Sequence, residues 1–285
     1  MIWSVVSKCE MICSSTTPVF RHYHEAVGKE RIRLAVVKDN DTMDFIKTGD
    51  IVLPRSASKG IIKTIREKGV RSTAEKWRAY ELANDKANLY EFLSRNGVCV
   101  PKQHKTIDTI CGNKYFVKPR YGSDSSCITD KSICMSMDEV KQQVTFIEGL
   151  TGQDAVVEDF IDGIDCTVSL WRENSSLHAC AIAIECPEHG NIQTKECKSD
   201  FSGFCSPLYD KSITTMAKDV FNLLGLRHHA RMDFRMDNDG GYWLIDVNLI
   251  PGLSPIGLWA KCLLLSNDMS YTEAVNAVIR SSSRT

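Results

Sequence analysis

The sequence predicts a mixed α/β and α+β protein of two or three lobes, with a small α/β lobe at the N-terminus. The chain has 285 residues, of which 43% are hydrophobic and 25% charged, enough for a buried core in more than one lobe. Strand-like and helix-like segments alternate in the first third of the chain, which indicates an α/β lobe. After about residue 100 the pattern changes to strands that finish in a hairpin.

Charge and cysteine content exclude several classes of protein. Lys plus Arg is 35 and Asp plus Glu is 36, which gives a net charge of −1 and no broad basic field for nucleic acid. The 12 cysteines form no CxxC pair and no zinc-finger quartet, so we expect free thiols in a reducing cytoplasm. No stretch approaches the ~20 apolar residues of a membrane span. The sequence therefore predicts a cytoplasmic protein whose anionic ligands are held by local charges.

Apolar runs and end signals place the elements of the first third. Compact runs rich in β-branched residues predict strands at 32–37 and 50–53. A helix is expected over 58–68, and a second, long helix with one apolar stripe over 73–96. Gly69 and Gly97 are positioned to end these two helices.

The rest of the chain alternates strands with two helices. Helices are expected over 137–150 and 211–224, and two short helices finish the chain. Strands are predicted at 115–118, 155–160, 165–171, 178–185, 230–236 and 242–249.

The most informative segment is the hairpin predicted over 230–249. Side chains alternate faces along a strand, and a four-residue loop over 238–241 is a common hairpin length. This register places Asp237 opposite Tyr242, Asp233 opposite Asp246 and Arg231 opposite Asn248.

Two carboxylates that face each other repel, unless a cation lies between them. Asp233, Asp246 and the carbonyl oxygen of Asn248 are hard ligands of the kind that Mg²⁺ prefers, with Mn²⁺ as a possible substitute. Arg231 beside the metal would offer a positive fork to a phosphoryl group or a tetrahedral oxyanion. The alternative is a solvated hairpin face with scattered charges, and we favour the metal site.

Two further segments have the chemistry of a nucleotide site. Lys118 ends an apolar strand and is followed by Gly122 and the SDSS turn, a setting that suits anionic phosphates. Glu158 follows the apolar run AVV, where free backbone groups at a strand end can bind a purine edge. Asp165 follows the next turn, where an acid can accept from ribose hydroxyls. Each segment alone is more typical of an ordinary strand end or surface hairpin, and neither is a Walker A loop.

The chain resembles the ATP-grasp superfamily, and most of all the D-alanine:D-alanine ligases. The resemblance rests on four segments in this order: KPRYGSDSS, VVEDFIDGIDCTV, RMDFR and LIDVNLIPGLS. The carbamoyl-phosphate-synthetase-like ligases are the second choice. The resemblance implies an ATP-grasp fold with a short N-terminal α/β (pre-ATP-grasp) lobe. It implies lobes at 1–85, 86–162 and 163–285, with ATP between the last two.

The resemblance also implies a reaction. An ATP-dependent carboxylate–amine ligase activates a carboxylate as an acyl phosphate and joins it to an amine, here from amino acids or short peptides. A kinase-like phosphotransferase of the same fold and a nucleotide-binding regulatory module without ligase activity are the alternatives. The resemblance implies small-molecule carboxylate and amine substrates and, as one possible assembly, a homodimer. We expect no nucleic-acid or membrane partner.

The resemblance assigns roles residue by residue. Asp233, Asp246 and Asn248 match the Mg²⁺ ligands, Arg231 the arginine that stabilises transferred phosphate, and Ser254 a substrate-carboxylate position. Lys195, with Lys198 as the rival, matches a lid lysine. ATP contacts are assigned to Lys86 and Lys118 (phosphates), Ser123, Ser125 and Ser126 (phosphate loop), Glu158 (adenine), Phe160 and Ile161 (hinge) and Asp165 (ribose).

The sequence departs from the family at several positions. Asp246 and Asp165 stand where glutamate is usual, and Asp124 places a carboxylate in the phosphate loop. No GGxSxE-type segment is found at the N-terminus, so the acid that would hold the ammonium of the first substrate has no recognised counterpart.

Overall fold

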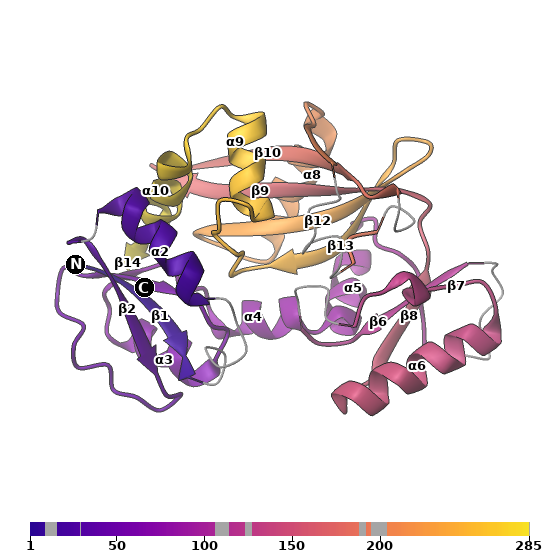
Figure 1. Cartoon of the computed structure of the whole chain (residues 1–285), viewed down its shortest axis with the longest axis horizontal. Helices are drawn as coiled ribbons and strands as arrows, with labels where there is room; N and C mark the ends of the chain where they lie inside the picture. Colours follow the sequence, from indigo (N-terminus) through magenta and orange to yellow (C-terminus); the bar gives the residue numbers. More distant parts are fainter. Residues whose placement is uncertain are drawn as a thin grey trace.

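The computed structural model describes residues 1–8, 16–28, 30–105, 114–122, 127–187, 192–194 and 204–284, with the backbone alone described at 16–20 and 23. Three sheets form three lobes, and the elements labelled in Figure 1 run from the N-terminal lobe through the central lobe to the C-terminal lobe. The predicted mixed α/β and α+β fold is confirmed. None of the described helices is long and apolar enough to cross a bilayer.

The N-terminal lobe contains a sheet in the order β14-β4-β3-β1-β2. Strands β1 to β4 are parallel, and β14, near the end of the chain, pairs antiparallel with β4. Both termini therefore lie in this lobe (Figure 1). Ser58 caps α3 by accepting a hydrogen bond from the backbone N–H of Ile61. The elements are β1 (Ile2–Ser7), α2 (Thr16–Val27), β2 (Ile32–Val37), β3 (Ile51–Pro54), α3 (Lys59–Glu67), β4 (Arg71–Ser72) and β14 (Ser283–Arg284).

The single helix predicted over 73–96 is wrong, because the chain forms two helices, α4 (Trp77–Asn84) and α5 (Lys86–Arg95). Asp85 between them is extended, with φ −97° and ψ 93°, and its carboxylate accepts from the backbone N–H of Asn88. Arg120 of the central lobe binds the same carboxylate with two contacts of 2.8 Å. An aspartate is a good N-cap, so α5 starts afresh and carries Lys86 at its first position.

The central lobe is a four-stranded antiparallel sheet in the order β5-β8-β6-β7, covered by helix α6. Ser136 caps α6, and Gly152, at φ 67°, ends it. The elements are β5 (Gln103–His104), β6 (Tyr115–Pro119), the 3₁₀ turn η2 (Asp130–Ser132), β7 (Ile133–Cys134), α6 (Met137–Thr151) and β8 (Ala155–Asp159).

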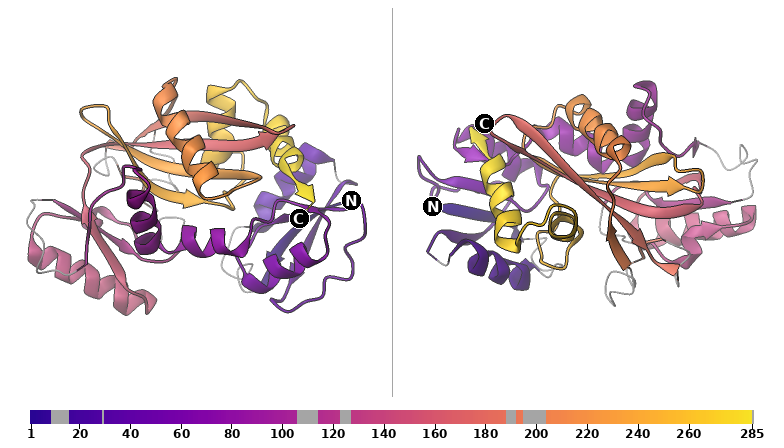
Figure 2. Two further views of the ribbon diagram at one scale, coloured as in Figure 1. Left: turned by 180° about the vertical axis from the view of Figure 1, so that it is seen from behind. Right: turned by 90° about the horizontal axis from the view of Figure 1, so that it is seen from above.

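The C-terminal lobe has an antiparallel sheet in the order β11-β10-β9-β12-β13. Helices α8 and α9 cover opposite faces of this sheet, as the two views of Figure 2 show. Helix α9 packs mainly on β9, β10 and β11, and the pocket lies over the β12–β13 side of the sheet, towards the central lobe. The elements are β9 (Gly163–Glu173), β10 (Ser176–Glu185), β11 (Phe204–Pro207), α8 (Lys211–Leu223), β12 (His229–Asp237), β13 (Tyr242–Asn248), α9 (Leu258–Ser266) and α10 (Tyr271–Ser281).

The β12–β13 hairpin confirms the predicted pairs Asp233–Asp246 and Arg231–Asn248. The predicted pair of Asp237 with Tyr242 is wrong, because Met236 faces Tyr242 and the register shifts by one residue after Asp233. Ile245 is the extra residue of this β-bulge.

The turn chemistry explains the shift. The Asp237 carboxylate accepts from the backbone N–H of Gly241 at 2.6 Å and from Trp243 Nε1 at 2.8 Å, which closes the turn one residue early. The bulge then restores the register, so that Leu244 packs in the core while Asp246 lies on the other side of the strand.

Candidate active site

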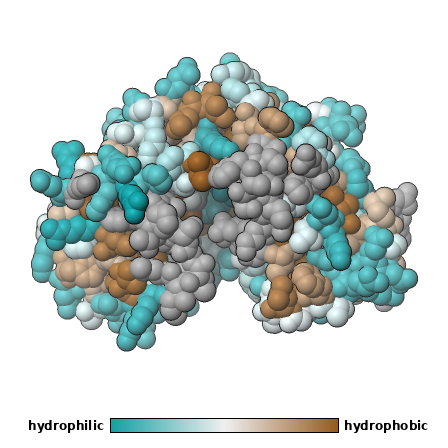
Figure 3. Space-filling view, in the orientation of Figure 1, coloured by the Kyte–Doolittle hydropathy of each residue, from teal (hydrophilic) through white to brown (hydrophobic). Residues whose placement is uncertain are grey.

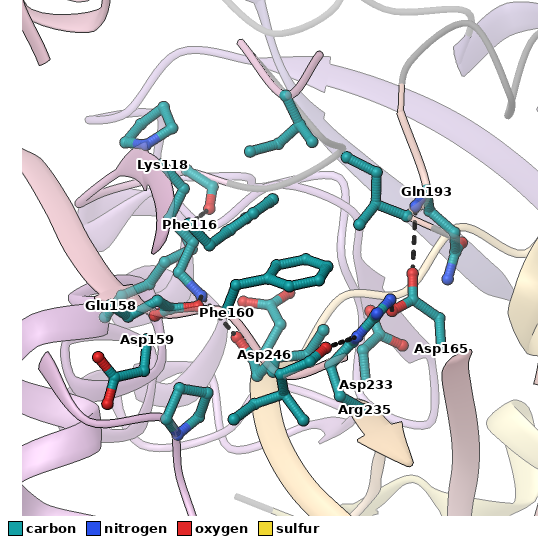
Figure 4. Close-up of a pocket in the computed structure, with 18 of the residues that line it drawn as sticks. Phe116, Lys118, Glu158, Asp159, Phe160, Asp165, Gln193, Asp233, Arg235 and Asp246 are labelled. Atoms are coloured by element: carbon teal, nitrogen blue, oxygen red, sulfur yellow. Dashed lines mark hydrogen bonds and ion pairs between the residues drawn. The ribbon is translucent and has the colours of Figure 1, made fainter. Parts of the chain in front are cut away.

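A pocket with a cavity volume of about 130 Å³ lies between the central and C-terminal sheets. The molecule is also indented between its N-terminal and central lobes at the lower edge of the space-filling view (Figure 3). The close-up of the pocket shows carboxylates, Arg235 and Lys118 around the aromatic rings of Phe116 and Phe160 (Figure 4). The predicted site residues that line it are Lys86, Lys118, Glu158, Phe160, Ile161, Asp165, Arg231, Asp233 and Asp246.

Some predicted residues do not line this pocket or cannot be placed. Asn248 and Ser254 are described but lie outside its lining. The Asn248 Oδ1 atom accepts from the backbone N–H of Ile250 at 2.9 Å, and the Ser254 hydroxyl from that of Ile256 at 3.4 Å. Ser123, Ser125 and Ser126, with Asp124, and Lys195, with its rival Lys198, lie outside the described residues.

Lys118 is fixed by three oxygen atoms from three different elements. Its Nζ lies 2.9 Å from Glu158 Oε1, 2.8 Å from the hydroxyl of Tyr90 and 3.3 Å from the carbonyl oxygen of Ile245. The bulge at Ile245 explains the third contact, because an unpaired bulge residue turns its carbonyl out of the strand ladder. The lysine is 5% exposed, so this network determines where its charge lies.

Tyr90 is a site residue that the sequence reasoning missed. Its hydroxyl donates to the carbonyl of Ile245 at 2.9 Å and accepts from Lys118. Tyr90 lies four residues after Lys86 on α5, so the helical spacing that places both on one face was the available signal.

For the ATP site that the sequence predicts here, replacing Tyr90 by phenylalanine should raise KM for ATP about 3- to 10-fold, because Lys118 loses one acceptor, typically worth ~0.5–1.5 kcal/mol. The change in kcat should be smaller. Steady-state kinetics at varied ATP concentration provides the measurement. Tyr80→Phe is the matched control, since Tyr80 is also buried but its hydroxyl accepts from the backbone N–H of Glu75 at 3.3 Å. Equal changes in KM for both variants would contradict a positioning role for Tyr90.

Glu158 offers an unused acceptor to the pocket. Its Oε1 atom binds Lys118, whereas its buried Oε2 finds no hydrogen-bond partner in the described part of the chain. Burial raises the pKa of Glu158, and the charge of Lys118 opposes that rise. A buried acceptor without a donor is costly, so this atom fits a ligand N–H such as an exocyclic amine.

Aromatic and apolar side chains wall the same end of the pocket. The rings of Phe116 and Phe160 are 6.1 Å apart at 38°, and both line the pocket together with Ile161. Such walls suit a flat heterocycle, because its faces are apolar and its edges carry the hydrogen-bonding groups.

Asp165, predicted to bind ribose, is held by Arg235 of β12, a residue to which the sequence analysis gave no role. Arg235 Nη1 lies 2.8 Å from Asp165 Oδ1, and the backbone N–H of Gln193 lies 3.1 Å from Oδ2. Arg235 also donates to the carbonyls of Ile161 and Gly163 at 3.1 and 2.9 Å. The pair therefore ties the hinge between the two lobes to strand β12. Burial raises the pKa of Asp165, which Arg235 opposes.

The facing carboxylates Asp233 and Asp246 differ in their surroundings. Asp233 Oδ1 accepts from Thr167 at 2.8 Å, and Arg231 binds both carboxylate oxygens at 3.0 and 2.8 Å. Burial raises the pKa of Asp246, the charge of Asp233 adds to that rise, and Lys86 opposes it. A cation between the two carboxylates would favour the ionised form of Asp246.

This donor set fits a magnesium ion that is bound together with a nucleotide. Two hard carboxylates face one pocket, and in the described residues no group of three His, Cys, Asp or Glu side chains could hold a metal alone. Mg²⁺ typically takes one or two carboxylates and completes its shell with water and substrate phosphates.

Lys86 approaches the same region from the start of α5. Its Nζ donates to the carbonyl of Gly122 at 2.6 Å, and burial lowers its pKa while Asp246 opposes that change. Gly122, at φ 98°, directly precedes the predicted phosphate loop. Two lysines from different elements, α5 and β6, therefore line the same pocket as the two facing carboxylates.

Three comparisons with known proteins bear on this site. An uncharacterized protein, y4sG of Sinorhizobium fredii, is 25% identical over 172 residues, 57% of this chain and 50% of that protein. A D-alanine–D-alanine ligase of Marinobacter nauticus is 22% identical, over 90% of this chain and 80% of that enzyme. The structure of a D-alanine–D-alanine ligase of Bacillus anthracis complexed with ATP has a TM-score of 0.71 at 17% identity, covering 98% of this chain and 96% of that one.

The structural likeness shows the fold, and the family follows from the sequence. Residues 88–280 match the model of the D-ala D-ala ligase C-terminus family, well over half of the chain. This chain therefore belongs to the D-ala D-ala ligase family, and the predicted resemblance to these ligases is confirmed.

Proposed function

We propose that this protein is an ATP-dependent carboxylate–amine ligase whose site consists of the pocket between the central and C-terminal lobes. The observation that carries the proposal is the facing pair Asp233 and Asp246 in a pocket that also holds Lys118 and the unpaired acceptor of Glu158. An ATP site needs carboxylates that hold a cation, lysines that neutralise phosphates, and a hydrogen-bond acceptor between apolar walls for the base. This pocket contains all three.

Each end of the pocket has its own task in binding ATP. Glu158 Oε2 accepts from the adenine amine between Phe116 and Phe160, while Lys86 and Lys118 neutralise phosphate oxygens. Asp233 and Asp246, with Asn248 as a third oxygen ligand, would hold Mg²⁺, or Mn²⁺ in its place. The ion would neutralise charge on the transferred phosphoryl group.

The reaction that this site supports has two displacements. A substrate carboxylate oxygen attacks the γ-phosphorus, which releases ADP and gives an acyl phosphate. The nitrogen of the amine substrate then attacks the acyl carbon, and the tetrahedral intermediate expels phosphate as the amine loses a proton. Arg231 lies two residues before Asp233 on β12. From there its guanidinium can bind the oxygens on which negative charge develops.

The remaining predicted residues complete the proposal. Ser254 would bind a substrate carboxylate, Phe160 and Ile161 would line the hinge, and Asp165 would reach the ribose through its place beside Arg235. Ser123, Ser125 and Ser126 would cover the phosphates, and Lys195 would close over them.

The substrates proposed are amino acids or short peptides. The Marinobacter relative is named a D-alanine–D-alanine ligase, which supports amino acids as the substrate class. A homodimer and a cytoplasmic location stay predictions.

The test is an ADP-release assay on pairs of amino acids of both enantiomers, with mass spectrometry of the products. Release should require a carboxylate and an amine together, and the product should be an amide plus phosphate. Release with neither substrate, or a stable phosphorylated product in place of an amide, would contradict the ligase and favour a kinase-like enzyme.

A further inference from the structure

Arg235, on β12, contacts both the hinge that connects β8 to β9 and the first residues of β9. Its Nε donates to the carbonyl of Ile161 at 3.1 Å, and its Nη2 to the carbonyl of Gly163 at 2.9 Å. Its Nη1 binds Asp165 Oδ1 at 2.8 Å, and its guanidinium carbon lies 5.0 Å from the ring centre of Phe160. This one side chain therefore contacts an aromatic wall of the pocket, two carbonyl oxygens and a carboxylate.

The two lobes hold opposite ends of the hinge. On the side of the central lobe, the backbone N–H of Phe160 donates to the carbonyl of Lys114 at 3.1 Å. On the side of the C-terminal lobe, Gly163 lies against β12, where a Cβ atom would collide with the carbonyl oxygen of Met236. The contacts of Arg235 span these two ends, so they fix the first residues of β9 relative to the aromatic wall.

Asp165 lies between the two ends of the proposed ATP site. Asp165 and Phe160 both line the pocket and both contact Arg235, so Asp165 lies beside the wall proposed for the base. In the sheet Asp165 pairs with Arg235, whereas Asp233, two residues earlier on the same face of β12, pairs with Thr167. Two residues of a strand span about 7 Å, so Asp165 is also close to the carboxylate proposed to bind the metal. The part of a nucleotide that connects the base to the metal-bound phosphates is the sugar.

The carboxylate of Asp165 can accept further hydrogen bonds from a sugar hydroxyl. In the described part of the chain, its Oδ1 atom accepts from Arg235, and its Oδ2 atom accepts from the backbone N–H of Gln193 at 3.1 Å (Figure 4). A carboxylate has about four acceptor positions, so each oxygen can take one more donor. The residue is 5% exposed, and a buried carboxylate that is bound through both oxygens keeps one orientation.

An arginine suits this position better than a lysine would. The guanidinium of Arg235 is buried and directs its N–H groups to one carboxylate and two carbonyl oxygens in fixed directions. A lysine ammonium has three donors on a flexible stem and no planar fork. A lysine at this position should therefore keep a positive charge beside Asp165 but lose control of its orientation and of the hinge carbonyls.

We infer that Arg235 is a positioning residue that orients Asp165 and the hinge towards the sugar of the nucleotide, so that the preference for ATP over its deoxy analogues depends on Arg235. This inference rests on the proposed function. Arg235 acts through Asp165 and through the hinge carbonyls, and it takes no part in the two displacements.

The test compares ATP with 2′-deoxyATP and 3′-deoxyATP, by release of the nucleoside diphosphate with an amino-acid pair from the screen. For the wild type, kcat/KM for at least one analogue should be about 10- to 100-fold lower than for ATP, the range for a hydrogen bond to a charged group. Arg235→Lys should reduce that preference at least about threefold, and Asp165→Asn should reduce it by as much or more. The double variant should show no further reduction beyond Asp165→Asn, because the two residues act as one unit.

The matched control is Arg280→Gln, because Arg280 Nε binds Glu173 Oε1 at 2.7 Å, at the far end of the same strand β9. Its preference for ATP should equal that of the wild type. A fall in kcat/KM for Arg235→Lys that is equal for ATP and both analogues would show a purely structural role and overturn the inference.

Equal use of all three nucleotides by the wild type would also overturn the inference, while the ligase function stands. Release of no nucleoside diphosphate with any amino-acid pair would instead contradict the proposed function. If Arg235→Lys does not fold, the same comparison with Arg235→Gln decides.

Discussion

Replacing Asp246 by asparagine should lower turnover by about 10²- to 10³-fold, while the protein stays folded. The expected loss is that for removing one group that stabilises charge in the transition state. Asparagine has nearly the same size but no charge, so one of the two facing carboxylates no longer offsets a cation. Burial already raises the pKa of Asp246, so the ionised side chain is disfavoured in the folded protein and its loss should not reduce the free energy of unfolding.

Turnover at varied magnesium concentration and thermal unfolding together check this prediction. Asp239→Asn is the control, because Asp239 is an exposed carboxylate in the turn of the same hairpin. That variant should keep the turnover of the wild type. Magnesium-dependent turnover at the wild-type rate in Asp246→Asn would contradict the metal assignment.

Replacing Arg231 by glutamine should lower kcat by about 10²- to 10³-fold and change KM for ATP by only a few-fold. The arginine is proposed to act on charge that develops in the transition state, so its loss should affect kcat rather than binding. Without a ligand, the variant should also unfold at a lower temperature, because Asp233 loses two charge-assisted hydrogen bonds worth on the order of 1–3 kcal/mol. Mg²⁺ with ATP should recover much of that loss.

The control for Arg231 is Arg172→Gln, an arginine at the far end of β9 that donates to the carbonyl of Ser175 at 3.0 Å. Its kcat should match that of the wild type. Equal changes in kcat and in KM for Arg231→Gln would indicate a simple binding role and contradict the proposed action in the transition state.

The part of the site that depends on local sequence pattern could be predicted from the sequence. Strand alternation and a short turn were enough to place Asp233 opposite Asp246. The shift at Ile245 could not be predicted, because it depends on the Asp237 carboxylate closing the turn early. It also depends on contacts between Ile245 and residues more than 120 positions away, Tyr90 and Lys118.

Contacts between lobes explain the other differences. Periodicity alone joined α4 and α5 into one helix, whereas Asp85 breaks it by capping α5 and binding Arg120 of the central lobe. The role of Arg235 follows from its contacts with residues 161–165, which sequence spacing did not reveal. Strand β1 was not among the predicted strands, although its pairing with β2 on one side and β3 on the other places it in the interior of the N-terminal sheet.

The most direct test of the account is electron paramagnetic resonance of Mn²⁺ titrated into the protein with a non-hydrolysable ATP analogue. The account predicts that the wild type binds the ion in the presence of the analogue. Asp233→Asn and Asp246→Asn should each weaken that binding at least about tenfold, since Mg²⁺-type sites rely on one or two carboxylates. Wild-type binding of the ion in both variants would contradict the claim that these two carboxylates together hold the metal.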